Sequence, residues 1–300
     1  MREWAAEVTV DAAVARRLIG EQFPELEVSS LRLLGEGWDT TVWLVEDEWV
    51  FRFPRRSYPV PGLENEIAYL PQLAPLLPLP IPNPTFAGRP SAAFRWPFYG
   101  CRFLPGRELA DAELDDEART ALARPLADFL RTLHAVELDA DLPLDPVRRA
   151  DMSFRVARTT ERLAELESLG LWAAPPLVSE LLESARDLPS PEPTATCHGD
   201  LHIRHVLVDE CCEPSAVIDW IDLSRNDPAV DLVLFWSTLP PEGREAFLGA
   251  YAPVSDEQLL RARVLALFLC GTLAVYACQE GMPALEREAV GSLDRITRSG

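Results

Sequence analysis

The alternation of apolar and polar residues in the first hundred positions predicts antiparallel strands. Residues 31–38, 41–45 and 49–53 are rich in β-branched, aromatic and leucine side chains, and a short acidic turn separates the last two runs. Such runs around a polar turn are typical of a hairpin. Residues 11–22 and 63–73 are expected to form helices, the second because its apolar residues recur at helical spacing. The pattern therefore predicts a small sheet accompanied by two helices.

A proline-rich segment follows. Residues 71–97 are expected to form an extended connection, because proline lacks the backbone donor and fixes φ, which excludes a regular helix or a central strand. Residues 98–104 then predict one more strand, which ends at the break formed by Pro105 and Gly106.

Beyond Gly106 the pattern becomes helical. Apolar residues line one face of residues 122–133, although Pro125 is expected to bend or split that helix. Residues 151–169 predict a further amphipathic helix, and helices return from Pro228 to the end. Two short strands, residues 205–209 and 216–219, interrupt the helices.

A strand-rich part followed by a helix-rich part predicts an α+β fold. We place the boundary after residue 104, which gives an N-terminal lobe of residues 1–104 and a helical C-terminal lobe of residues 105–300.

The charge of the chain is strongly negative. The net charge is −20, which argues against nucleic acid or an anionic membrane as the main partner. All 28 basic residues are arginine, so any phosphate contact that lysine usually makes must fall to an arginine. Residues 107–300 carry 18 arginines and 35 acidic residues, a net charge of −17. This acidic half could attract a cationic substrate, or it could be a solvated surface that keeps the protein soluble.

The cysteines and the apolar runs indicate a cytoplasmic protein. The six cysteines form no zinc-binding spacing, and we expect reduced thiols. The longest apolar run, residues 264–278, is shorter than the roughly 20 residues that a bilayer span needs. We therefore expect a buried helix and no membrane partner.

The most informative motif is His198-Gly199-Asp200, followed by His205 and, fourteen positions later, by Asp219. The protein-kinase catalytic loop has the same order: a His-x-Asp, a metal-binding side chain five positions later, then a second metal-binding Asp. Asp200 is the candidate base for phosphoryl transfer to an alcohol, and His198 is expected to orient the loop.

The metal-binding candidates differ in their chemistry. Asp219 follows an apolar strand, where a carboxylate needs a cation or a donor, and magnesium on nucleotide phosphates would supply the cation. His205 could be a second ligand, or it could only pack and donate a hydrogen bond, because magnesium prefers oxygen. Asp209 and Asp222 lie in turn-like sequence and are expected to be exposed.

Four residues of the N-terminal part could contact the nucleotide. Gly35 and Gly37 could let backbone amides approach phosphates, or they could simply form a hairpin turn. Arg52 alternates with two phenylalanines, so it points away from them, either to the surface or toward phosphates. Glu66 on the following helix could pair with Arg52, as a helix Glu pairs with the strand Lys in kinases.

Together these segments resemble the aminoglycoside phosphotransferase family, and the similarity covers most of the chain. The matching segments are residues 34–45, 49–55, 63–70, 101–106, 130–136, 198–201, 217–220 and 226–232. The resemblance implies a bilobal protein-kinase-like fold. It implies Asp200 as base, His205 and Asp219 on Mg²⁺, and Asp231 as a support of the catalytic loop.

The resemblance also implies that Arg52 and Glu66 lie at the phosphates of ATP or GTP, and that the backbone of Arg102, Phe103 and Leu104 forms a hinge that binds the purine. Arg52 stands where lysine is commoner. His205 stands where asparagine is commoner. In carrying histidine at this position, the chain is similar to the 2″-aminoglycoside and macrolide phosphotransferase branches.

Three functions are compatible with these residues. The favoured one is Mg²⁺-dependent transfer of a nucleotide γ-phosphate to a hydroxyl of a small, cationic molecule, an aminoglycoside or similar antibiotic, with Glu280 as a guess for a substrate contact. A housekeeping sugar or amino-alcohol kinase is an alternative. The departures at Arg52 and His205 motivate another, a pseudokinase-like module that binds nucleotide without turnover.

Overall fold

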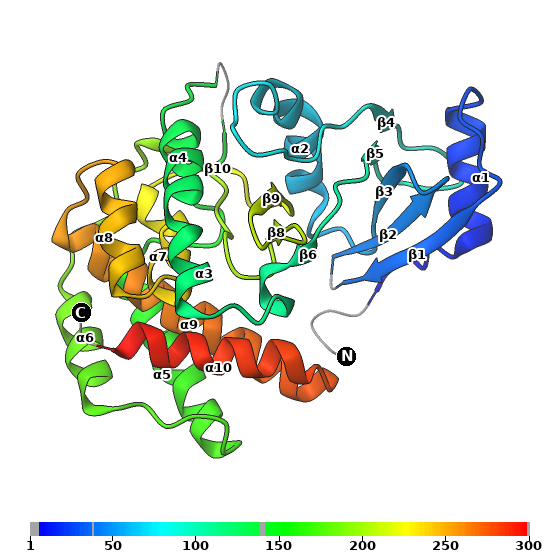
Figure 1. The fold of residues 1–300 in the computed structure, drawn as a ribbon. Coiled ribbons are helices and arrows are strands. Elements are labelled where there is room, and N and C mark those ends of the chain that lie inside the picture. The colour runs from blue at the N-terminus through cyan, green and yellow to red at the C-terminus, as the bar shows by residue number, and fades with distance from the viewer. Residues whose placement is uncertain (1–5, 38, 139–141, 299–300) are drawn as a thin grey trace. The chain divides into compact units, whose positions relative to one another are not determined.

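The computed structural model describes residues 6–37, 39–138 and 142–298. The chain divides into two compact units: unit 1 comprises Met1–Leu76 and Pro80–Leu104, and unit 2 comprises Leu77–Leu79 and Pro105–Gly300 (Figure 1).

Unit 1 is built on one antiparallel sheet with the strand order β1-β2-β3-β5-β4. Its elements are α1 (Ala12–Gln22), β1 (Leu31–Glu36), β2 (Thr40–Val45), β3 (Trp49–Pro54), α2 (Val60–Leu73), β4 (Phe86–Gly88) and β5 (Phe98–Arg102). The predicted hairpin is confirmed, with Val45 opposite Trp49 beside the acidic turn.

The two faces of this sheet pack on different helices. Phe51 and Phe53 of β3 belong to an apolar cluster that includes Leu18 of α1. On the other face, Tyr99 of β5 packs with Leu63 of α2. Successive residues of a strand point to opposite faces, so the alternation that predicted β3 also separates the core side chains from those that face α2.

The proline-rich segment differs from the prediction in two ways. Pro71 lies inside α2, close to its C-terminal end. The helix predicted for residues 63–73 is therefore confirmed through Pro71, and the extended connection begins only after α2 ends, at the loss of one hydrogen bond in its last turn. Residues 86–88 form the edge strand β4, which contains no proline and pairs with β5 on one side only.

Unit 2 is mostly helical and carries two small sheets. Its helices are η1 (Leu109–Asp111), α3 (Asp116–Ala121), α4 (Ala123–His134), α5 (Met152–Ser168), α6 (Pro176–Arg186), η2 (Pro228–Asp231), α7 (Val233–Ser237), α8 (Pro241–Ala250), α9 (Asp256–Glu280) and α10 (Pro283–Thr297). The strands are β6 (Arg107–Glu108), β7 (Ala195–Cys197), β8 (Val206–Val208), β9 (Pro214–Val217) and β10 (Ser224–Asn226), in the orders β6-β8-β9 and β10-β7.

The long helix α9 forms the centre of unit 2 and packs against α5, α7 and α10 (Figure 1). It begins at a capping box of Ser255 and Gln258 and ends at Gly281, whose φ of 68° is left-handed. Among the described residues, α9 is the one helix long and apolar enough to cross a membrane by length and composition, and 67% of its most apolar window is buried. This burial is what a core helix requires.

The split that the sequence predicts in a helix near Pro125 is present. Helix α3 ends at Ala121 and α4 begins at Ala123, which places Pro125 in the first turn of α4. The amides of a first turn have no partner within the helix, so proline costs little there.

Candidate active site

The loop that follows β7 is fixed by a buried carboxylate. Asp231 at the end of η2 accepts hydrogen bonds from the backbone N–H of His198 at 2.8 Å and of Gly199 at 2.9 Å. It also lies 3.0 Å from Nε2 of His134 on α4. Burial raises the pKa of the Asp231 carboxyl, but the hydrogen bond and charge of His134 and the other donors outweigh burial, so its pKa lies below the ordinary value. An ionised Asp231 therefore holds the start of the loop.

His198 joins this loop to the segment after β9. Its Nδ1 accepts from the backbone N–H of Asp200 at 3.2 Å, so its Nε2 carries the proton and donates to the Ile218 carbonyl at 3.0 Å. Burial lowers the pKa of His198, which keeps the ring neutral. The predicted orienting role of His198 agrees with these contacts.

Gly199 has no room for a side chain. Its φ is +85°, and an added Cβ would lie 2.2 Å from the backbone oxygen of Asp222. Glycine is therefore required for both its backbone conformation and this close approach. The loop around Asp200 and the segment containing Asp222 are in direct contact at this point.

His205 links two of the predicted site residues. Its Nδ1 lies 2.7 Å from the Asp200 carbonyl, and a carbonyl can only accept, so Nδ1 carries a proton. Its Nε2 lies 3.4 Å from Oδ2 of Asp219. The hydrogen bond at Nδ1 therefore fixes the ring with its other nitrogen, Nε2, facing the Asp219 carboxylate, and a hydrogen bond at one ring nitrogen is what orients a metal-binding imidazole at the other.

Asp219 lies two residues beyond β9 rather than at its end. Its φ of 65° is left-handed, which is unusual for a residue with a side chain, and its side chain is 37% exposed. The conformation directs Asp219 to His205 rather than along the strand.

Asp200 has a cationic partner that the sequence did not suggest. Its side chain is 19% exposed, and Oδ1 lies 3.0 Å from Nη1 of Arg149. The other nitrogen of Arg149, Nη2, donates to Oδ2 of Asp222. The expectation that Asp222 is exposed was wrong: its carboxylate is 18% exposed because it binds Arg149, whereas Asp209 is exposed as predicted.

His202 is a second residue that the sequence analysis missed. The side-chain ligand atoms of Asp200, His202 and His205 all lie within 4.8 Å of one another, which could suggest a metal site. However, His202 Nδ1 accepts from the backbone N–H of Arg204 at 3.3 Å, so a neutral ring carries its proton on Nε2, 3.9 Å from Asp200 Oδ2. Burial lowers the pKa of His202 well below its ordinary value. The Nε2–H of His202 thus faces Asp200 from beyond hydrogen-bond distance, and a neutral ring with this pattern has no free lone pair for a metal.

In unit 1 the expected pair of Arg52 and Glu66 is present. Nη1 of Arg52 on β3 donates to Oε1 of Glu66 on α2 at 3.2 Å, and both residues are buried. Arg52 is therefore not a surface residue.

The two glycines lie at the β1–β2 hairpin. Gly35 lies in β1 at an irregularity of the register, and the Gly37 N–H donates to the Thr40 carbonyl at 3.0 Å. Arg55 binds both the Gly37 carbonyl, at 2.6 Å, and Glu36, at 2.7 Å. A Cβ at either glycine would meet no close atom, so neither position requires glycine in this conformation.

The segment expected to bind the purine continues β5. Arg102 is exposed, forms an ion pair with Glu48 and stacks on Trp49 at 4.0 Å. The Phe103 N–H donates to the Glu48 carbonyl at 2.8 Å, so in this conformation that amide is already used. Leu104 is the last residue of unit 1 and is half-buried.

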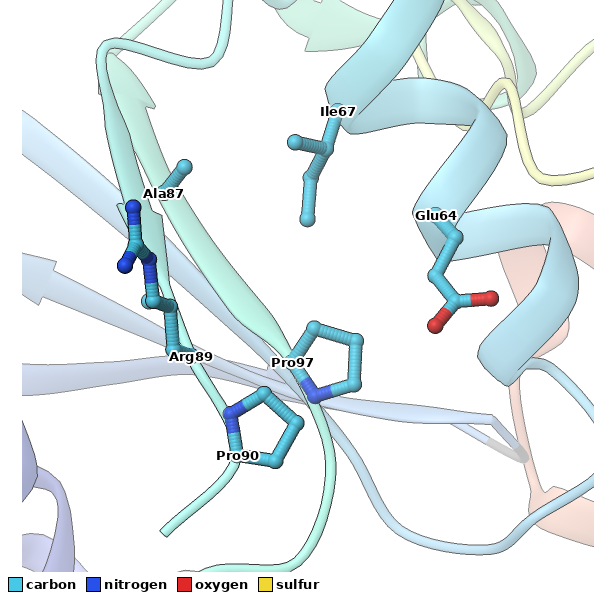
Figure 2. A pocket seen from close by; sticks show the side chains of 7 residues that line it. Glu64, Ile67, Ala87, Arg89, Pro90 and Pro97 are labelled. Atoms are coloured by element: carbon cyan, nitrogen blue, oxygen red, sulfur yellow. The ribbon is translucent and has the colours of Figure 1, made fainter.

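Two further features complete the description. A shallow hollow of ≈ 310 Å³ in unit 1 is lined by Ile67, Ala87, Pro97 and neighbouring residues (Figure 2), and none of the candidate residues contributes to it. Glu280, the guessed substrate contact, is the exposed last residue of α9.

Comparison with solved structures shows the fold. The chain is similar to the GDP and kanamycin complex of APH(2″)-IIia, with a TM-score of 0.69 and 24% identity over 94% of this chain and 97% of that one. It is also similar to the macrolide 2′-phosphotransferase MphH from Brachybacterium faecium, with a TM-score of 0.60 and 23% identity over 95% and 99% of the two chains. The predicted α+β, protein-kinase-like fold is thereby confirmed.

Sequence comparison addresses the family. An aminoglycoside 3′-phosphotransferase from Streptomyces fradiae is 32% identical over 156 residues, which are 50% of this chain and 56% of that relative. The match thus spans little more than half the length of that relative. The model of the phosphotransferase enzyme family matches residues 30–263, a span that includes every candidate site residue except Glu280. The chain therefore belongs to the phosphotransferase enzyme family, as its resemblance to the aminoglycoside phosphotransferases predicted.

Proposed function

We propose that this protein transfers the γ-phosphate of ATP or GTP to a hydroxyl of a small cationic molecule, an aminoglycoside or similar antibiotic. The observation that carries the proposal is the position of His205. Its Nδ1 is held by the backbone of Asp200, and its Nε2 lies 3.4 Å from Asp219. The candidate base and the two candidate metal ligands are therefore gathered within one unit, in a chain of the phosphotransferase enzyme family.

Asp200 is the base in this proposal. Its Oδ1 is buried beside Arg149, which leaves Oδ2 to accept the proton of the acceptor hydroxyl. The electron pair of that hydroxyl oxygen forms the new bond to the γ-phosphorus, and the bond to the nucleoside diphosphate breaks. Such a transfer depends mostly on positioning and on charge stabilisation.

Asp219 and His205 would hold the divalent cation. The carboxylate of Asp219 suits Mg²⁺, and the hydrogen bond at Nδ1 of His205 leaves Nε2 available as a ligand. When bound, Mg²⁺ neutralises charge on the nucleotide phosphates. Because imidazole is a softer ligand than the amide oxygen of asparagine, we expect this pair to accept Mn²⁺ as well as Mg²⁺.

The nucleotide would be held by residues of unit 1. Arg52, fixed by Glu66, would bind phosphate oxygens with its planar fork. The hairpin containing Gly35 and Gly37 would present backbone amides to phosphates, and the segment Arg102–Leu104 would contact the purine. ATP and GTP are made and kept in the cytoplasm, so a cytoplasmic location fits the proposed reaction.

A cationic acceptor fits the charge and the relatives. Residues 107–300 have a net charge of −17, and carboxylates such as Glu280 could pair with ammonium groups. The relatives include an aminoglycoside 3′-phosphotransferase and a kanamycin complex, but also a macrolide phosphotransferase. Aminoglycosides and macrolides are therefore the first acceptors to test.

The proposal is tested by following nucleotide turnover with ATP and with GTP over a panel of aminoglycosides, macrolides, sugars and amino alcohols, with mass spectrometry of the products. We expect acceptor-dependent turnover that Asp200→Asn lowers by about 10³-fold, because general-base catalysis and the positioning of the hydroxyl are lost together. Asp219→Asn should weaken metal-dependent nucleotide binding.

Asp187→Asn, a change at an exposed residue that follows α6, serves as the matched control and should leave turnover unchanged. Equal and negligible turnover by the wild type and Asp200→Asn on every acceptor, with nucleotide still bound, would instead establish a non-catalytic nucleotide-binding module.

A further inference from the structure

Arg149 lies in the segment before α5 and is bound on both sides of its guanidinium. Its side chain is 12% exposed; Nη1 lies 3.0 Å from Asp200 Oδ1, and Nη2 donates to Asp222 Oδ2. Burial lowers the pKa of Arg149, but the charges of Asp200 and Asp222 outweigh burial and raise it above its ordinary value. This arginine is therefore a permanent cation between two carboxylates.

The backbone around Arg149 is fixed as well. Oδ1 of Asp145 accepts the Arg149 N–H at 2.6 Å, and Oδ2 accepts the Ala150 N–H at 2.9 Å. Arg261 on α9 donates to the Ala150 carbonyl. The guanidinium therefore projects from a rigid base, which is what a group needs if it is to hold another side chain in place.

Asp222 connects this cation to the catalytic loop by a second route. Its side chain binds Nη2 of Arg149, while its backbone oxygen lies against Gly199, the residue before Asp200. Asp222 therefore contacts both the guanidinium of Arg149 and the loop that carries Asp200. A planar guanidinium with two fixed anions has only one orientation that satisfies both.

We propose that Arg149 is a positioning residue for the base Asp200, with Asp222 as its anchor. This inference rests on the proposed function. Arg149 binds Oδ1 and thereby turns Oδ2 toward the acceptor hydroxyl. The side chain of His202 lies on the Oδ2 side at 3.9 Å, so the two oxygens of the carboxylate have different surroundings. The carboxylates of Asp200 and Asp222 already neutralise the charge of Arg149, which argues against a role of this arginine in binding a substrate anion.

The test compares Arg149→Met and Arg149→Lys with the wild type in steady-state kinetics and in thermal unfolding. We expect Arg149→Met to lower kcat by about 100-fold, the loss expected for a reacting group misplaced by roughly an ångström, with KM for the nucleotide changed by no more than about two-fold. Arg149→Lys should recover part of kcat, because an ammonium reaches only one of the two carboxylates.

Asp222→Asn tests the anchor. It is also a second variant in case Arg149→Met misfolds, since Arg149→Met leaves two half-buried carboxylates without their cation. This variant should lower kcat by about 10-fold, and adding Arg149→Met to it should lower kcat by less than the same change does in the wild type. Arg158→Met, which removes an exposed arginine of α5 paired with Glu161, is the control and should leave kcat unchanged.

The positioning role would be overturned if Arg149→Lys and Asp222→Asn kept the wild-type kcat, or if their loss appeared in KM alone. Either result would leave the proposed function intact. Absence of acceptor phosphorylation by the wild type would overturn the proposed function itself, and the role of Arg149 with it.

Discussion

The hydrogen-bond roles of the three histidines in the loop after β7 follow from their neighbours. His198 and His202 each accept a backbone N–H at Nδ1, whereas Nδ1 of His205 faces the Asp200 carbonyl and must donate. Only His205 can therefore present a lone pair at Nε2 while neutral. Histidine thus adopts two different hydrogen-bond patterns within eight positions, and the neighbouring backbone group decides which pattern each ring has.

These assignments predict a pH dependence of stability. His202 has a pKa well below 6.5 when folded, chiefly because of burial, so between 6.5 and that lower value the unfolded chain binds more protons. The contribution of His202 to stability therefore falls as pH falls from 7.5 to 5.5, by at most about 1.4 kcal/mol per pH unit. We expect His202→Gln to show a smaller drop in melting temperature over this range than the wild type.

His198 titrates in the same direction, since burial also lowers its pKa, and it remains in both proteins. The wild type and His202→Gln should therefore still share part of the drop. Identical pH profiles of the two proteins would show that His202 is not held neutral by the fold.

At the scale of elements, the site depends on short irregular segments held by longer ones. The loop after β7 is fixed by Asp231 on η2, and the segment after β9 passes through the left-handed residue Asp219 and meets Gly199 at Asp222. The strands themselves are only three or four residues long. The geometry of the site is thus set by contacts between loops rather than by strand pairing.

Gly199→Ala tests this contact. Its positive φ alone should cost about 1–3 kcal/mol, and the clash with the Asp222 backbone should add to that cost. We expect a lower free energy of unfolding in denaturant titrations, together with a large loss of turnover. Gly249→Ala on α8, where an added Cβ meets no atom within 4 Å, should instead be neutral or stabilising by up to about 1 kcal/mol.

A Gly199→Ala protein as stable and as active as the wild type would mean that the two loops can separate without consequence.

At the scale of the whole molecule, the charge is concentrated in the C-terminal part. The net charge of −20 falls mainly on residues 107–300, although several carboxylates there are neutralised by arginines such as the buried Arg119 and Arg261 and the half-buried Arg149. The remaining acidic field would raise the local concentration of a cationic acceptor.

This field predicts a salt dependence that distinguishes classes of acceptor. With nucleotide and metal saturating, kcat/KM for a polycationic aminoglycoside should fall several-fold as ionic strength rises from about 0.05 to about 0.5 M. Added salt shortens the Debye length and thereby screens the attraction between the acceptor and the acidic surface. For an acceptor without ammonium groups, kcat/KM should change little. The same salt dependence for both acceptors would show that the acidity serves solubility alone.

The local pattern was enough to predict several elements and one pairing. Alternation predicted β2 and β3 as a hairpin, and periodicity predicted α5. Because Arg52 lies on the strand face opposite Phe51 and Phe53, its partner could be sought on the next helix, where Glu66 was found. Short strands such as β7 and β10 were missed, since three residues carry no periodicity.

What the sequence determined by itself is the order of reactive residues, because the spacing of His198, Asp200, His205 and Asp219 is a property of the chain alone. Only the tertiary structure decided which neighbours set their chemistry. Arg149 lies 51 positions before Asp200 and Asp222 lies 22 after it, and no local pattern relates the three. Their convergence depends on how α9, η2 and the loops pack, and packing determines both burial and the partners that keep buried charges paired.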